Sequence, residues 1–331
     1  LYKAQNDCRL AHFSILWNQG GILMKRFCFF SILLWLVFVV VAMAACTESF
    51  DPAGKLNNTE AQMLGIRAEP PEVGGGDTLT LDALLHFPQG QPHYLWLICI
   101  PTKLEELSAC VSSQLGQELP PPCDLGIPAT LCTASLQPSF SYTVPPIVLP
   151  PDVPEFLFFV QLVVSPAEDV WSQCAQNIRD NRPTPDCMIG LKNVIYSSRE
   201  VKNANPRISH FVVNNQPVTF GTVWNVAEEE KIEFNVALEQ SSLDELRDES
   251  QNTNFIFMDM AYYTTCGTLE RWEDRWYCEM ALDGSQQITC DPIEPNLVKP
   301  RKELQGSCVI HAVIRDNLGG IDWLTQEFLF P

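Results

Sequence analysis

The sequence predicts an all-β protein built from two β-sandwiches in tandem. Short apolar stretches alternate with polar residues, turn-forming residues are frequent (25 Pro and 17 Gly among 331 residues), and helical periodicity is scarce. Strand side chains point alternately to two faces, so this pattern is typical of sandwiches rather than helical bundles. At about 100–200 residues per domain, the length accommodates two domains.

The first sandwich is expected over residues 62–198. Its predicted strands are 63–68, 78–84, 93–99, 155–164 and 190–197. The stretch 155–164 is too apolar for a solvent-exposed edge strand. We expect a short helix around 169–174 and a Pro- and Cys-rich loop over 101–138.

The second sandwich is expected over residues 204–331, after a polar boundary at 199–206. Its predicted strands are 208–213, 231–238, 255–263, 308–315 and 321–328. Asp316-Asn317-Leu318-Gly319-Gly320 separates the last two strands, and its glycines permit the positive φ of a hairpin turn. Residues 241–254 form an acidic insertion with helical character.

Residues 24–45 have the pattern of an export signal. Lys25 and Arg26 precede an uncharged apolar stretch, 27–45, that closes on small residues directly before Cys46. The segment resembles a bacterial lipoprotein signal peptide, with Met43 where that family usually carries Leu. The resemblance implies cleavage before Cys46 and acylation of its thiol and new amino group, which is enough for stable membrane anchoring. The alternative is an uncleaved transmembrane helix, since 19 apolar residues just span a bilayer.

The remaining N-terminal residues follow from this assignment. Residues 1–23 are expected to reflect a start site placed too early, with Met24 as the first residue, and 46–61 to form a polar tether. Thr47, rather than Asp, follows the cysteine, which by the enterobacterial sorting pattern favours the outer membrane. We therefore expect a cell-envelope protein, on the periplasmic face or the surface.

Three stretches of the chain resemble tandem immunoglobulin-like lipoproteins of delta-proteobacteria, of the myxobacterial type. They are 66–73 with 77–83, then 205–208, and finally 312–323. The resemblance covers both domains and implies two immunoglobulin-like sandwiches. It implies no activity, because fold alone does not define function.

Cysteine usage fits export. Cys8 and Cys28 precede the cleavage site and Cys46 is assigned to lipid, which leaves ten disulfide candidates: Cys99, Cys110, Cys123, Cys132, Cys174, Cys187, Cys266, Cys278, Cys290 and Cys308. None forms a C-x-x-C pair, so zinc is not expected. Six precede residue 190 and four follow it, so each half can close its own pairs. Proximity favours Cys174–Cys187 and Cys290–Cys308, and the other connectivities stay open.

The net charge excludes nucleic-acid binding. Residues 1–45 hold four of the 21 basic and one of the 40 acidic residues, so the mature chain has 17 against 39, a net charge of −22. Phosphate recognition needs a dense basic surface. No G-x-S-x-G, H-E-x-x-H or glycine-rich phosphate loop is present, so we expect no catalytic residues, no cofactor and no metal.

Trp272, Trp276 and Tyr277 are the candidate ligand-binding residues. Charged residues are interleaved with them between Cys266 and Cys278, which is typical of an exposed loop that stacks on sugars or anchors a protein. The alternative is that one tryptophan caps the core. We expect a non-enzymatic, lipid-anchored protein for binding, adhesion or envelope assembly, with an envelope protein or glycan as partner. A carbohydrate-binding module and a glycan hydrolase that uses two carboxylates are the alternatives.

Overall fold

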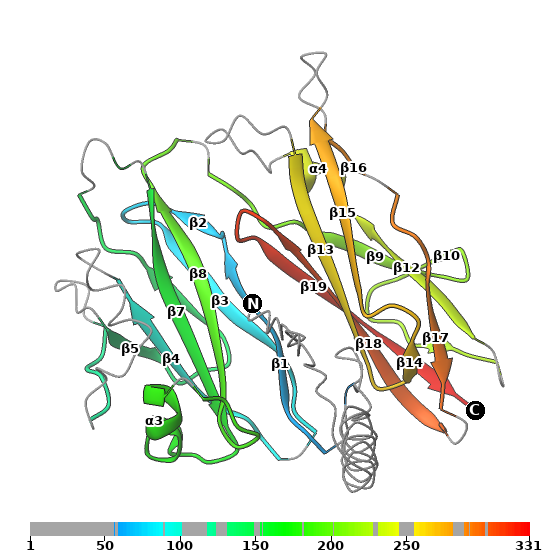
Figure 1. Ribbon diagram of the computed structural model, residues 1–331, viewed down its shortest axis with the longest axis horizontal. Helices are drawn as coiled ribbons and strands as arrows, with labels where there is room; N and C mark the ends of the chain where they lie inside the picture. Colours follow the sequence, from blue (N-terminus) through cyan, green and yellow to red (C-terminus); the bar gives the residue numbers. More distant parts are fainter. Residues whose placement is uncertain are drawn as a thin grey trace, which may run out of the picture. The chain divides into compact units, whose positions relative to one another are not determined.

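The computed structural model consists mainly of β-strands (Figure 1). It describes residues 56, 59–88, 90–100, 118–123, 131–148, 153, 155–180, 182–200, 202–227, 231–244, 255–280, 288–290, 292–301 and 304–331. Within these residues, two sandwiches of two sheets each follow one another along the chain. The prediction of an all-β fold of tandem sandwiches is confirmed.

The first sandwich pairs a three-stranded with a five-stranded sheet. The three-stranded sheet has the order β1 (Gln62–Glu69), β3 (Thr78–His86), β6 (Phe140–Thr143). The five-stranded sheet has the order β2 (Glu72–Val73), β8 (Met188–Ser197), β7 (Glu155–Ser165), β4 (His93–Cys99), β5 (Cys132–Ser135). Strand β7 pairs with both β4 and β8, so the most apolar stretch is a central strand, as expected.

The predicted short helix covers part of the outer surface of this sandwich. Helix α3 (Val170–Asp180) buries Val170, Cys174 and Ile178, which recur every four residues and pack against residues of β4 and β7. Asp169 caps its N-terminus, accepting a hydrogen bond from the Ser172 amide at 3.0 Å.

The second sandwich pairs a five-stranded with a six-stranded sheet. The first has the order β10 (Gln216–Val218), β9 (Ile208–Val213), β12 (Ile232–Leu238), β17 (Asn296–Pro300), β14 (Gly267–Leu269). The second has the order β11 (Trp224–Asn225), β19 (Ile321–Phe330), β18 (Gly306–Asp316), β13 (Phe255–Thr264), β15 (Glu273–Met280), β16 (Ile288–Cys290). A short helix, α4 (Gln240–Asp244), falls within the predicted insertion, whose residues 245–254 lie outside the described part.

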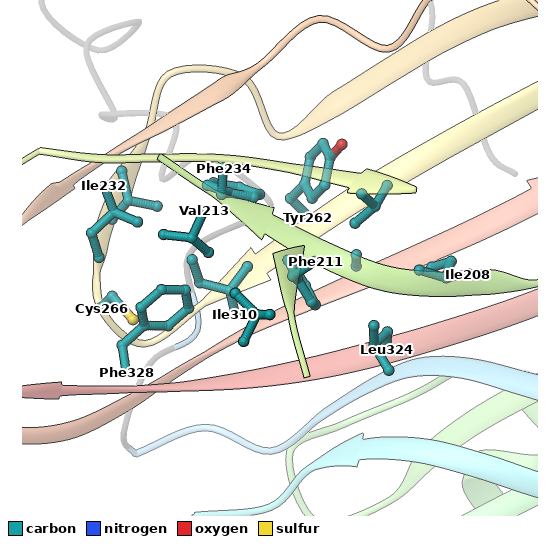
Figure 2. Packing of buried hydrophobic residues seen from close by; sticks show 14 of the residues in the cluster. Ile208, Phe211, Val213, Ile232, Phe234, Tyr262, Cys266, Ile310, Leu324 and Phe328 are labelled. Atoms are coloured by element: carbon teal, nitrogen blue, oxygen red, sulfur yellow. The ribbon is translucent and has the colours of Figure 1, made fainter. Parts of the chain in front are cut away.

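Aromatic residues from both sheets fill the second core (Figure 2). Phe211 and Phe234 have ring centroids 6.2 Å apart, and Phe234 meets Tyr262 edge-on at 5.2 Å. These three side chains and Phe328 are at most 1% exposed. The alternation in 231–238, 255–263 and 321–328 therefore reports real burial, because each strand puts every second side chain into this core.

Four disulfides join described cysteines: Cys123–Cys132, Cys174–Cys187, Cys266–Cys308 and Cys278–Cys290. Each lies within one sandwich, and the predicted Cys174–Cys187 bridge is confirmed. The predicted Cys290–Cys308 bridge is wrong, because Cys278 on β15 lies directly opposite Cys290 on β16. Cys99 is also disulfide-bonded, and Cys110 lies outside the described residues.

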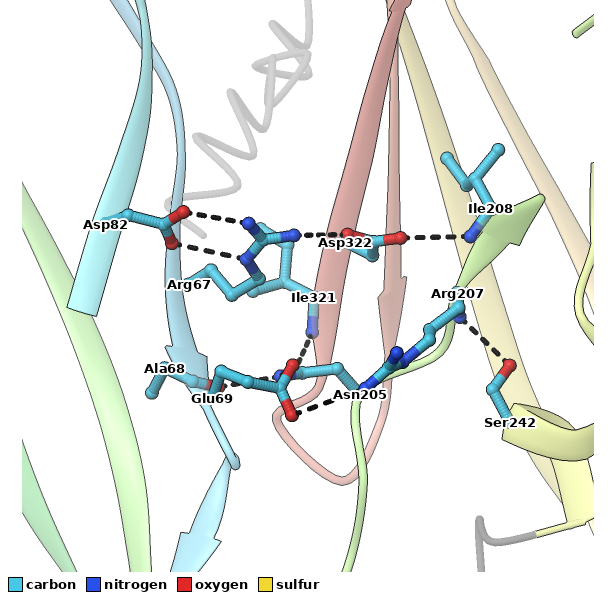
Figure 3. Close-up of polar contacts among 10 residues, drawn as sticks. All are labelled: Arg67, Ala68, Glu69, Asp82, Asn205, Arg207, Ile208, Ser242, Ile321 and Asp322. Atoms are coloured by element: carbon cyan, nitrogen blue, oxygen red, sulfur yellow. Dashed lines mark hydrogen bonds and ion pairs between the residues drawn. The ribbon is translucent and has the colours of Figure 1, made fainter. Parts of the chain in front are cut away.

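Arg67 of the first sandwich holds the two sandwiches together (Figure 3). It donates to both carboxylate oxygens of Asp82, at 3.2 and 2.8 Å, and to Asp322 of β19 at 2.5 Å. Its guanidinium carbon also lies 4.4 Å from the ring centre of Trp323. One arginine thus links a β1–β3 pair to the start of β19.

Asn205, in the connection between the sandwiches, fastens the same junction. Its side-chain amide donates to the Ala68 carbonyl at 2.7 Å and to Glu69 at 2.9 Å. Its oxygen accepts from the Ile321 amide at 2.8 Å. Because Asn205 is only 1% exposed, these bonds are shielded from water, and the connection is a structured element rather than a free linker.

A buried lysine and a buried aspartate complete the junction. Lys192 of β8 donates to the Gly319 carbonyl in the turn between β18 and β19. Asp316, in the same turn, accepts from the Leu318 and Gly320 amides. Burial raises the pKa of Asp316 to about 6 and lowers that of Lys192 to about 8.

The raised pKa of Asp316 predicts a stability loss as pH rises. The folded protein binds this proton more tightly than the unfolded chain, whose carboxyl titrates near its ordinary value of 3.8. The free-energy cost of ionising the buried Asp316 carboxyl is therefore absent below pH 4, grows as pH rises to 6 and is complete above pH 6. The free energy of unfolding of Asp316→Asn, measured in urea relative to wild type, should therefore increase by on the order of 2 kcal/mol from pH 4 to pH 6.5. A pH-independent difference would contradict the prediction.

Leu56, within the predicted polar tether over 46–61, contacts the second sandwich. This residue is 0% exposed, and its amide donates to the Thr264 carbonyl at 2.9 Å. Arg301 donates to the Leu56 carbonyl at 3.5 Å. The chain is therefore fixed to the second sandwich at Leu56, before it enters the first sandwich at β1.

Candidate binding surface

Two exposed aromatic residues lie side by side on the outer face of β13 and β15. Phe257 pairs directly with Tyr277 across the strands. Their ring centroids lie 5.1 Å apart, and the ring planes form an angle of 70°. Phe257 is 41% and Tyr277 46% exposed. The neighbours Met258 and Cys278 are 0% exposed, so strand alternation turns the aromatic pair away from the core.

An ion pair occupies the next position on the same face. Asp259 and Arg275 lie opposite each other, two residues along from the aromatic pair. Arg275 donates two hydrogen bonds to the Asp259 carboxylate, one from Nε to Oδ1 and one from Nη2 to Oδ2 at 3.1 Å. The Phe257 amide also donates to Asn317 at 3.2 Å, which ties this end of β13 to the β18–β19 turn. The four side chains, Phe257, Asp259, Arg275 and Tyr277, form what we call the aromatic–ionic surface.

The rest of this sheet face is partly covered by the first sandwich. The next strand, β18, is covered at Val313, which is 0% exposed, and Arg315 donates to the Leu64 carbonyl of β1 at 2.7 Å. Gly65 of β1 lies directly over Ile321 of β19. The aromatic–ionic surface is thus an exposed part of the sheet next to a covered part.

The predicted ligand loop is largely a strand. Trp276 and Tyr277 lie within β15, and Trp276 pairs with Met258; its side chain lies outside what the structure describes. Trp272 precedes β15 and is 41% exposed. Tyr277 lies five positions after Trp272, which corresponds to about 17 Å in extended chain. The structure therefore does not bring these two aromatic residues together.

Charged residues that interact with one another flank Trp272 in the sequence. Arg271 bonds to Glu294 at 2.8 Å and lies 3.6 Å from Asp274. Burial raises the pKa of Asp274, and one of its oxygens has no hydrogen-bond partner among the described residues. The hydroxyl of Tyr262 is likewise buried without a described partner, and burial raises its pKa. These charged residues, with the exposed Trp272 that follows Arg271 in the sequence, form a second candidate site.

Sequence reasoning missed Phe257, Asp259 and Arg275 as site residues. Their signal is the two-residue period of 255–263, which places Phe257 and Asp259 on one face. That period does not reveal which strand is the neighbour or in what register. Only the pairing of β13 with β15 brings Phe257 to Tyr277.

Several other predicted features can be placed only in part. Cys46 and residues 24–45 lie outside the described residues, so lipid attachment stays a prediction. The described part of the chain contains no helix long and apolar enough to cross a membrane. Nor do its His, Cys, Asp and Glu side chains form a group of three suited to a metal ion. His311, buried and bonded to Thr325 at 2.8 Å, has its pKa lowered to about 4 by burial and by His86.

Comparison with known proteins adds little beyond the fold. No protein family and no curated protein matches the chain. Among solved structures it resembles fibronectin(III)-like modules of Clostridium thermocellum CbhA (7% identity, 82% of this chain and 93% of that one, TM-score 0.21). It also resembles a bacterial ice-binding adhesin (11% identity, 82% of this chain and 65% of that one, TM-score 0.20). A third similar structure is Bacteroides ovatus SGBP-B, solved with a mixed-linkage heptasaccharide (9% identity, 82% of this chain and 48% of that one, TM-score 0.18). At these TM-scores the likenesses carry no argument about function. The fold itself defines a disulfide-bonded protein of two β-sandwiches.

Proposed function

We propose that this chain is a non-enzymatic, lipid-anchored envelope protein that binds a partner through the aromatic–ionic surface. The observation that carries the proposal is the exposed Phe257–Tyr277 pair beside the Asp259–Arg275 ion pair. Aromatic residues and arginine are the side chains that most often dominate binding energy at interfaces.

The scaffold supports this role because it fixes the surface before binding. The four residues lie on two paired strands, and a disulfide joins β15 to β16 through Cys278 and Cys290. A surface held rigid in advance loses little conformational entropy when a partner binds. The aromatic rings supply apolar area, while the ion pair offers both a donor and an acceptor to the partner.

Two independent features support the proposed location at the cell envelope. The segment before Cys46 resembles a lipoprotein signal peptide, and four disulfides join described cysteines. Disulfides persist in oxidising compartments such as the bacterial periplasm and the cell surface. Both features favour export, and acylation of Cys46 would then hold the protein at the envelope.

The double variant Phe257→Ala/Tyr277→Ala tests the surface. Purified protein should lose retention on isolated envelope fractions by about 30-fold or more, since each of the two hot-spot truncations costs about 1–2 kcal/mol or more. The melting temperature should change little, because both side chains point away from the core. Phe220→Ala is the matched control, as Phe220 is 75% exposed and lies on the connection between β10 and β11. Equal retention of wild type and double variant, or an equal loss for Phe220→Ala, would overturn the proposal.

Carbohydrate binding at Trp272 is the second candidate function. Trp272 is exposed and follows Arg271 in the sequence, and the Arg271 partners Asp274 and Glu294 supply carboxylate acceptors for sugar hydroxyls. Trp272→Ala should then abolish retention on envelope polysaccharide columns while the unfolding curve stays unchanged. Polysaccharide retention that survives Trp272→Ala would exclude this site.

A further inference from the structure

The chain between Cys46 and β1 is fixed to the second sandwich at Leu56. Leu56 is fully buried, although it belongs to neither of the two main core clusters. Its amide bonds to the carbonyl of Thr264, the last residue of β13, and its carbonyl accepts from Arg301. Along the chain from Cys46, the second sandwich is therefore contacted at Leu56 before the first sandwich begins at β1.

The length of the preceding segment limits how far Leu56 lies from the anchor. Leu56 lies only ten positions after Cys46 in the sequence. A flexible chain of that length has an end-to-end distance of about 17–19 Å. If Cys46 carries lipid, the Leu56 end of the second sandwich is accordingly close to the membrane.

Strand β13 places the aromatic–ionic surface at the opposite end. Thr264, next to Leu56, ends the strand, whereas Phe257 lies near its beginning. They lie seven positions apart, which is about 24 Å in an antiparallel strand. Lys202, in the connection between the sandwiches, forms an ion pair with Asp77 at 3.2 Å, near Gly74 and the end of β8.

Two exposed cations lie at the Leu56 end. Lys299 is near the end of β17, opposite Thr268 of β14, and Arg301 follows that strand. Both are exposed on a chain whose mature form has a net charge of −22. A lysine or arginine close to an anionic lipid surface is attracted to it, so these two side chains favour contact with phospholipid headgroups.

We infer that the end of the second sandwich formed by Leu56, Thr264, Lys299 and Arg301 rests on a phospholipid bilayer. The aromatic–ionic surface is then held away from the membrane, facing its partner. The inference rests on the proposed lipid anchor at Cys46, and it adds which end of the molecule meets the lipid.

Amine labelling of the intact lipoprotein in liposomes tests this orientation. The acylated protein is inserted into vesicles of phosphatidylethanolamine and phosphatidylglycerol, and each lysine is quantified by peptide mass spectrometry after brief acylation. The measured quantity is the labelling rate of Lys299 divided by that of Lys202. In the wild-type protein this ratio should be at least fivefold lower than in the variant Leu56→Asp. That variant puts a charge at a buried site and should release the segment while both cores remain intact. Arg301→Ala should show a smaller shift in the same direction.

The outcomes separate the inference from the proposal on which it rests. Failure of wild-type protein to insert into vesicles, with an unmodified Cys46 by mass, would overturn the lipid anchor. Successful insertion with the same ratio of Lys299 to Lys202 labelling in wild type and Leu56→Asp would overturn the orientation and leave the anchor standing. Protection in wild type that Leu56→Asp abolishes would support both.

Discussion

Removal of the Cys266–Cys308 disulfide should destabilise the second sandwich by about 4 kcal/mol, as estimated from the entropy of its long loop. The two cysteines are 42 residues apart, the longest separation among the four described bridges. Both are buried, so the Cys266→Ala/Cys308→Ala variant also leaves space in a close-packed core. Chemical denaturation followed by tryptophan fluorescence measures the loss.

The Cys123→Ala/Cys132→Ala variant is the control for this prediction. Its bridge spans nine residues in the first sandwich, and the same loop-entropy estimate gives about 2.7 kcal/mol. The stability of the second sandwich should be unaffected by it. If removing the long bridge costs no more than removing the short one, the loop-entropy account of these disulfides fails.

Arg67→Ala should separate the unfolding of the two sandwiches and cost about 3 kcal/mol, typical of an ion pair broken by removing one partner. The substitution removes three hydrogen bonds to Asp82 and Asp322 and the contact with Trp323. It also leaves two carboxylates near each other without their shared cation. Calorimetry should then resolve two transitions instead of one.

Arg275→Ala is the matched control for Arg67→Ala. Arg275 also bonds to a carboxylate with two nitrogens, but its side chain is 56% exposed against 27% for Arg67. An exposed ion pair contributes about 0–1 kcal/mol. A single cooperative transition for Arg67→Ala, with a loss no larger than that of Arg275→Ala, would show that the junction does not couple the sandwiches.

The long strands could be predicted from the sequence because they combine apolar content with clear alternation. The ranges 155–164, 208–213 and 321–328 reappear as β7, β9 and β19 with small changes at their ends. The hairpin at 316–320 was also correct, and Gly319 has the positive φ of 90° that its turn requires. Short strands such as β10, β11 and β14 were missed, because two or three residues carry no measurable period.

The disulfides and the binding surface depend on strand pairing, which a single sequence does not contain. Cys290 is closer in sequence to Cys308 than Cys266 is, yet Cys308 pairs with Cys266. Tyr277 was identified as a candidate, but its neighbour Phe257 lies 20 residues earlier and meets it only through the β13–β15 register. Leu56 was assigned to a tether because polar residues surround it, and only the structure reveals its burial.

Mass spectrometry of the non-reduced protein from its native membrane is the decisive test of a lipid-anchored, disulfide-bonded envelope protein. We expect an N-terminal Cys46 carrying acyl chains, with residues 1–45 absent and the ten remaining cysteines oxidised. Peptides should contain the Cys174–Cys187, Cys266–Cys308 and Cys278–Cys290 bridges. An unmodified Cys46 with residues 24–45 retained, or free thiols at these positions, would contradict a lipid-anchored protein of the oxidising envelope.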